Sequence, residues 1–126
     1  MLQVSTENIG DMAVIECEGR IAYGEAAELR DAVIAQKRAR MLILDFSEVS
    51  AIEGAGLEML VFLQYWAQQR DIQFKVFNPS YSVRYRLEQA SSAHEIEIAS
   101  LPEVMALLMQ AENQMAQESN SSAIAA

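Results

Sequence analysis

The chain has 126 residues, 52% of them hydrophobic, and carries 18 acidic against 9 basic residues, a net charge of −9. This length suits one domain with its own core, and the composition excludes a disordered chain. Proteins that bind nucleic acid or anionic membranes normally present a basic face, so the charge argues against both classes. A single cysteine, Cys17, excludes an internal disulfide. With the single histidine, His94, it provides too few ligands for a Cys/His zinc site.

The amino-terminal residues lack the basic and apolar regions of a signal peptide, and no uncharged apolar run is long enough to span a bilayer. We therefore expect a cytoplasmic protein with no direct membrane insertion, no metal and no other cofactor. Cys17 is expected to be a buried structural thiol, and His94 a loop or surface residue. The cluster Arg30, Lys37, Arg38 and Arg40 is interpreted as a solvated helix face, with a docking patch as the alternative.

The first predicted elements form a hairpin, a helix and a strand. Residues 2–6 and 12–18 have strand patterns on either side of a turn, and Gly19 is expected to end the second strand. Residues 25–38 have apolar positions at helical spacing. The continuous apolar run 41–46 predicts a central, parallel strand.

The second half of the chain continues to alternate between helix and strand. The strongest helix pattern covers 54–69, and a strand over 72–77 follows it. Ser80 is a candidate N-cap for a helix over 81–90. Residues 95–99 alternate like a short edge strand, and Pro102 fits the first turn of a final helix over 102–115.

The predicted order is β-β-α-β-α-β-α-β-α, which indicates a single α/β domain. Its sheet is expected to be mixed but mostly parallel, and packed with helices. The domain is predicted to cover 1–116. Residues 117–126 are rich in Ser, Asn and Ala, and are predicted to form a flexible tail.

Functional groups collect at strand-to-helix turns in such sheets. Here a strand ends in Leu44-Asp45-Phe46-Ser47, a connection containing Val49 and Ile52 follows, and Glu53-Gly54-Ala55-Gly56-Leu57 opens the next helix. This stretch resembles the STAS domain of bacterial anti-sigma factor antagonists, in which a strand ending in LDLS leads to DSSGL. The stretch FKVFNPSYSVRYRL at 74–87 matches a second element of that family, so the resemblance covers roughly residues 4–109.

The resemblance implies a docking module without its usual switch. In the family, the first serine of DSSG accepts phosphate from a partner kinase that is also the anti-sigma factor, and phosphorylation releases the antagonist. Gly54 and Ala55 stand at the two serine positions of this chain, and neither can be phosphorylated. The glycines Gly54 and Gly56 also fit a tight turn of any function, and Glu53 suits any helix start.

The helix over 54–69 carries apolar residues on more than one face. Its inward arc is predicted to contain Met59, Leu60, Phe62, Leu63, Trp66 and Ala67. Leu57, Val61 and Tyr65 fall outside this arc, which indicates either burial against a neighbouring helix or a partner surface. Trp66 and Tyr65 would be typical anchors of such a surface. Because the resemblance implies docking at this turn and helix, the predicted partner-binding residues are Glu53, Gly54, Ala55, Gly56, Leu57, Val61 and Tyr65.

The predicted function is a non-enzymatic regulatory module that docks an anti-sigma factor/serine kinase or a related switch protein. The alternative is a STAS accessory subunit of an ABC-type lipid transporter or of another signalling complex. A phosphoreceiver with Asp45 as acceptor is disfavoured, because the first strand lacks an acid pair and Lys75 lies within its strand. Asp45 is instead expected to be a turn carboxylate, and Ser47 and Ser50 loop serines. No catalytic residue and no nucleic-acid partner are predicted, and a homodimer is left open.

Overall fold

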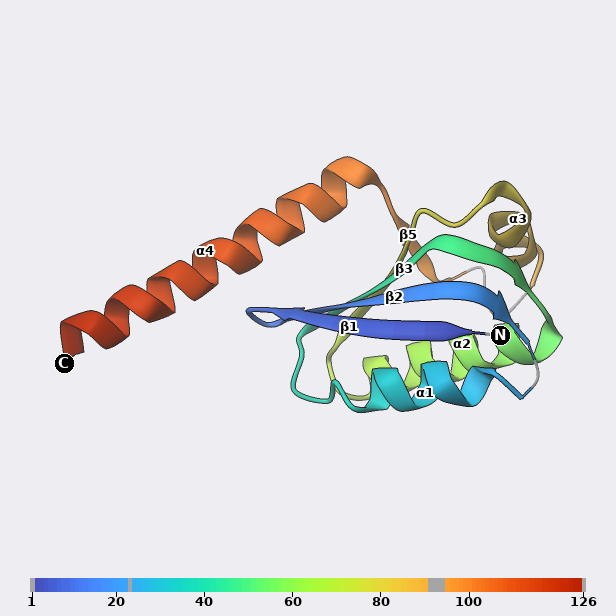
Figure 1. Ribbon diagram of the computed structural model, residues 1–126, viewed down its shortest axis with the longest axis horizontal. Helices are drawn as coiled ribbons and strands as arrows, with labels where there is room; N and C mark the ends of the chain where they lie inside the picture. The colour runs from blue at the N-terminus through green and yellow to red at the C-terminus, as the bar shows by residue number, and fades with distance from the viewer. Residues whose placement is uncertain (1, 23, 91–94, 126) are drawn as a thin grey trace.

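The computed structural model describes residues 2–22, 24–90 and 95–125, with side chains in the last helix described through Gln117; His94 lies outside these residues. A five-stranded sheet with the order β1-β2-β3-β4-β5 forms its centre (Figure 1). β1 (Gln3–Ile9) pairs antiparallel with β2 (Met12–Ile21). The other strands, β3 (Met41–Ile52), β4 (Gln73–Phe77) and β5 (Glu97–Ala99), follow in parallel. The predicted mixed, mostly parallel sheet is confirmed.

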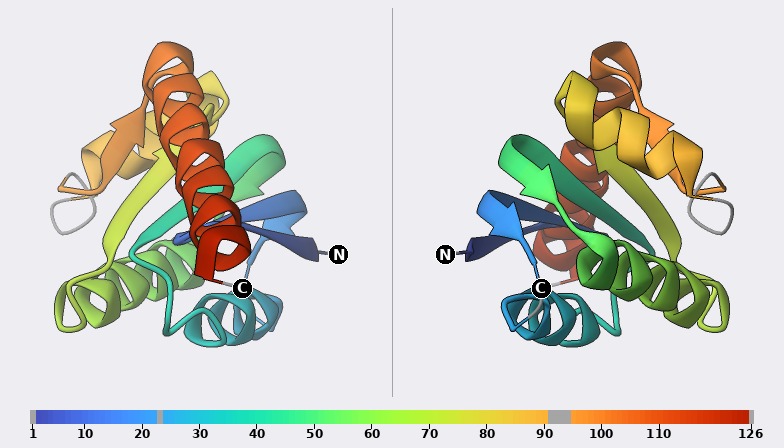
Figure 2. Two further views of the ribbon diagram at one scale, coloured as in Figure 1. Left: turned by 90° about the vertical axis from the view of Figure 1, so that its left-hand side faces the viewer. Right: turned by 90° about the vertical axis from the view of Figure 1, so that its right-hand side faces the viewer.

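The helices cover the two faces of the sheet unequally. α1 (Ala26–Ile34) and α2 (Gly54–Gln68) lie side by side on one face (Figure 2). α3 (Tyr81–Gln89) packs beside β3, and Ser80 caps it as predicted by accepting a hydrogen bond from the Val83 backbone N–H at 3.3 Å. α4 (Leu101–Ala125) packs on the opposite face and projects past the β1–β2 hairpin (Figure 1). The predicted order of strands and helices is therefore confirmed.

The main core lies between the sheet and the α1–α2 layer. Leu42, Leu44 and Phe46 of β3 are fully buried there. Because successive strand side chains point to opposite faces, Ile43 joins a smaller apolar cluster under α4 instead. Every apolar residue in the first five positions of β3 therefore has a packing partner, which explains why the run is continuous rather than alternating.

Three strands are longer than predicted. β1 runs to Ile9 instead of ending near residue 6, because it pairs with β2 along its whole length. Gly19 does not end β2: it adopts a φ of 112° beside a register shift, and the strand continues to Ile21. β3 runs to Ile52 instead of ending near residue 46, because its second half pairs with the end of β2. Glu53 alone therefore separates β3 from α2.

The last helix is also longer than predicted, since α4 continues beyond residue 115 to Ala125. Its first turns are fixed to the sheet by Lys75, which pairs with Glu97 and lies 3.3 Å from Glu103. Further along, the Gln114 side-chain amide donates to the Asp11 carboxylate at 2.8 Å. Residues 117–125 are thus helical, while the flexibility of this tail and the domain boundary at 116 stay predictions.

Candidate functional site

The turn between β3 and α2 is held against the end of β2. The Glu53 backbone N–H donates to the carbonyl oxygen of Ile21 at 3.0 Å, and the Leu57 N–H donates to the Glu53 carbonyl at 2.9 Å. The Glu53 side chain makes no capping hydrogen bond; its carboxylate instead lies 3.4 Å from the Arg20 guanidinium. Both side chains are about half exposed, so this surface ion pair orients Glu53 more than it stabilises the fold.

The two glycines of the turn have different roles. A Cβ on Gly56 would lie 2.6 Å from the Ile21 carbonyl oxygen and 2.8 Å from Ile21 Cγ2, so the close approach of α2 to β2 requires glycine here. A Cβ on Gly54 would meet nothing within 4 Å, and Gly54 does not have a positive φ. The backbone of the turn therefore does not require glycine at position 54, and another residue would fit there.

The outward strip of α2 is only partly exposed. Leu57 and Val61 are half-buried and pack against the core, whereas Tyr65 is 61% exposed. Trp66 is buried and stacks under the Arg70 guanidinium, 4.6 Å from its ring centroid, so it is not available as a surface anchor. Phe62, predicted to face inward, is 49% exposed because it lies at the edge of the buried arc. The exposed aromatic anchors of α2 are thus Tyr65 and Phe62.

Sequence reasoning missed a groove that adjoins the turn. It has a volume of about 250 Å³ and lies between the end of β3 and α3, lined by Ala51, Ile52, Glu53, Ser82, Val83 and Arg86. On the outer face of α3, Tyr81 and Tyr85 are 85% and 52% exposed. The spacing of these tyrosines in the sequence predicts that they lie together, opposite the buried Val83 and Leu87, but it does not predict the groove.

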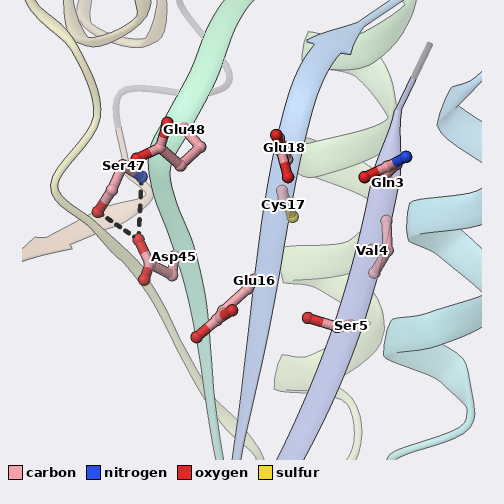
Figure 3. A pocket seen from close by; sticks show the side chains of 9 residues that line it. All are labelled: Gln3, Val4, Ser5, Glu16, Cys17, Glu18, Asp45, Ser47 and Glu48. Carbon is pink, nitrogen blue, oxygen red and sulfur yellow. Dashed lines mark hydrogen bonds between the residues drawn. The ribbon is translucent and has the colours of Figure 1, made fainter.

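A second hollow, on the sheet face not covered by α1 and α2, contains Asp45 and Ser47 (Figure 3). Asp45 accepts hydrogen bonds from the Ser47 N–H at 2.9 Å and the Ser47 hydroxyl at 2.5 Å, and the Asn78 amide donates to that hydroxyl at 3.2 Å. Asp45 is therefore satisfied by hydrogen bonds, but it lies within β3, as do Ser47 and Ser50. The predictions of a turn carboxylate and of loop serines are wrong, because β2 pairs beside this part of the chain. Lys75 is engaged by Glu97 and Glu103 rather than by Asp45, which further disfavours the phosphoreceiver hypothesis.

The remaining candidate residues lie away from the turn. Cys17 is buried, and this burial, with a smaller effect of Asp45, raises the pKa of its thiol to about 12. The basic cluster is not the predicted helix face: only Arg30 lies on α1, which ends at Ile34, and Lys37, Arg38 and Arg40 lie in the connection from α1 to β3. Within the cluster Arg30 pairs with Asp31, and Arg40 lies 3.7 Å from Asp11. Among the described residues, no group of three or more His, Cys, Asp or Glu side chains could hold a metal ion.

The part of the chain that the structure describes contains no helix with the length and apolar character needed to cross a membrane.

Comparisons with known proteins concern the family and the fold of the chain. The family model of the STAS domain matches residues 3–103. The unphosphorylated anti-sigma factor antagonist SpoIIAA is similar, with a TM-score of 0.68 at 14% identity over 87% of this chain and 97% of SpoIIAA. The phosphorylated form of SpoIIAA, from Bacillus, gives 0.64 at 15% identity over 84% and 99% of the two chains.

An anti-sigma factor antagonist from Mycobacterium paratuberculosis gives a TM-score of 0.72 at 18% identity, over 86% of this chain and 95% of that protein. At such identities the likeness establishes the fold. No curated protein sequence matches the chain.

Proposed function

Because this chain belongs to the STAS domain family, we propose that it is a non-catalytic regulatory module that docks an anti-sigma factor/serine kinase or a related switch protein. The docking surface consists of Glu53, Gly54, Ala55 and Leu57 with Val61 and Tyr65. Gly56, also predicted to bind the partner, is buried against Ile21 and supports the turn from beneath. The solved structures named above as anti-sigma factor antagonists share its fold, which supports this class of function. The exposure of Tyr65 supports the choice of surface. A tyrosine that is exposed in the free protein and becomes buried when a partner docks is a typical interface anchor.

The observation that carries the proposal is that position 54 is a glycine with open space around it. Gly54 is the first residue of α2, at the position of the family's phosphorylated serine, and the space around it is open. The turn thus has room for a side chain and for the serine of the family, yet this chain has neither a hydroxyl nor a charge there. A phosphoserine would add roughly −1.5 to −2 charges at this point. Its absence makes docking constitutive rather than gated by phosphorylation.

Binding to purified kinases tests this function. The ATP-binding anti-sigma factors of the source organism are titrated with the protein by isothermal calorimetry, before and after long incubation with ATP. We expect at least one to bind, with the same Kd before and after incubation. If none binds, the proposed function is wrong; if binding is lost after incubation and intact mass shows added phosphate, docking is gated after all.

A further inference from the structure

The groove between β3 and α3 has the size and surface of a receptor for a single side chain. Its volume of about 250 Å³ lies below the range of roughly 300–1,000 Å³ found for small-molecule sites. The buried residues Ile52 and Val83 give it an aliphatic inner surface. Burial of an aliphatic side chain here would add favourable apolar contact.

One charged group at the groove is available for a partner. Arg86 lines the groove and is exposed, and within residues 2–22, 24–90 and 95–117 no ion pair involves it. The Glu53 carboxylate of the opposite wall is already paired with Arg20. Arg84, on the same helix, is paired with Glu88 at 3.0 Å. The groove therefore combines an aliphatic interior with a cation at its edge, in a chain whose net charge is −9.

We propose that this groove receives an aliphatic side chain of the docked partner protein, beside an Asp or Glu of the partner that pairs with Arg86. The inference rests on the proposed function, because the groove and the turn share Glu53, and it extends the docking surface from α2 to α3. Tyr85, half exposed on the outer face of α3, would contact the partner at the rim of this surface. A partner carboxylate at Arg86 can pair with the guanidinium in a planar, bidentate geometry.

A random peptide library displayed on phage, selected on the full-length protein, tests the recognition chemistry without knowledge of the partner. We expect enrichment of peptides in which Asp or Glu lies next to Leu, Ile or Val. For an enriched synthetic peptide, Arg86→Ala should weaken binding about tenfold, as for a contributing interface arginine. Arg84→Ala removes the same charge from the other side of α3 and should leave affinity unchanged. Ser82→Trp fills the groove from an exposed position and should abolish binding.

Two results would overturn the proposal: no enrichment of acidic–aliphatic peptides, or enriched peptides that bind the Arg86→Ala and Ser82→Trp variants as tightly as wild type. Thermal melts of each variant confirm that the fold is retained. Failure of the groove can be distinguished from failure of the proposed function. A kinase that binds wild type and Arg86→Ala equally, but not a variant of the turn, overturns the groove and leaves the function intact. If selected peptides bind the groove but no anti-sigma kinase binds the protein, the proposed function is wrong and the groove proposal stands.

Discussion

Gly56 lies so close to Ile21 that a Cβ on the glycine would come within 2.6 Å of the Ile21 carbonyl oxygen. The Glu53 N–H, three residues earlier, donates to that same oxygen. The first turn of α2 is therefore docked on the end of β2 by a hydrogen bond and by direct backbone contact. This contact fixes the direction in which position 54 and the exposed side of α2 face.

Gly56→Ala should destabilise the protein by about 1–3 kcal/mol, because backbone and the Ile21 side chain must move to accommodate the new methyl group. Gly54→Ala is the matched control. It enters open space and should leave stability unchanged or raise it by up to about 1 kcal/mol. Urea denaturation of both variants measures the difference, and equal midpoints would show that the contact with Ile21 is not tight.

Most of the fold could be predicted from the sequence, because the spacing of apolar residues indicates which side chains are buried in a helix or strand. The run 41–46 and the helix over 54–69 were assigned correctly for that reason. The continuation of β3 to Ile52 was not, since residues 47–52 look like a loop until β2 pairs beside them. Gly19 was misread as a strand end because a register shift depends on the neighbouring strand.

The candidate site was predictable in part. The motif located the turn, but only the three-dimensional contacts separate Gly56, which must be glycine, from Gly54, which need not be. Helical angles placed Tyr65 outward correctly and Phe62 inward incorrectly, because the width of the buried arc depends on which elements pack there. The groove at α3 combines residues about thirty positions apart, and no local pattern reports such a juxtaposition.

The stability of the domain should depend strongly on the centre of β3. Leu44 is fully buried in the main core, so Leu44→Ala removes packed side-chain volume with little room for relaxation. The expected loss in the free energy of unfolding is about 2–5 kcal/mol. Chemical denaturation measures it, and a variant that unfolds at the wild-type midpoint would show that this position is not packed as described.

No phosphorylation is expected at the turn of the wild-type protein, whereas Gly54→Ser should restore an acceptor. The space around position 54 is open, so the serine hydroxyl is accessible to a kinase. Intact mass after incubation with a bound anti-sigma kinase and ATP should show one phosphate on the variant and none on wild type. Phosphate on wild-type Ser47 or Ser50 would mean that the acceptor has moved within the chain.

Stability should fall at alkaline pH through Cys17. Burial raises the pKa of this thiol from 9.0 to about 12, so between these values the unfolded chain loses a proton that the folded chain keeps. The stabilisation is complete below pH 9 and is lost as the pH rises toward 12. Urea unfolding at pH 7 and pH 10 should show a larger decrease for wild type than for Cys17→Ala. Parallel decreases would show that the thiol is not protected.

The central claim is that an uncharged position 54 keeps docking constitutive, and the affinity of Gly54→Asp for a kinase that binds wild type tests it most directly. The carboxylate occupies open space, so the variant should fold, and its charge imitates part of a phosphoserine. We expect calorimetry to show affinity reduced about tenfold or more, because the new carboxylate would be desolvated in the docked complex without an opposite charge to pair with, while Gly54→Ala binds like wild type. A Gly54→Asp protein with a wild-type melting temperature and a wild-type Kd would contradict the account.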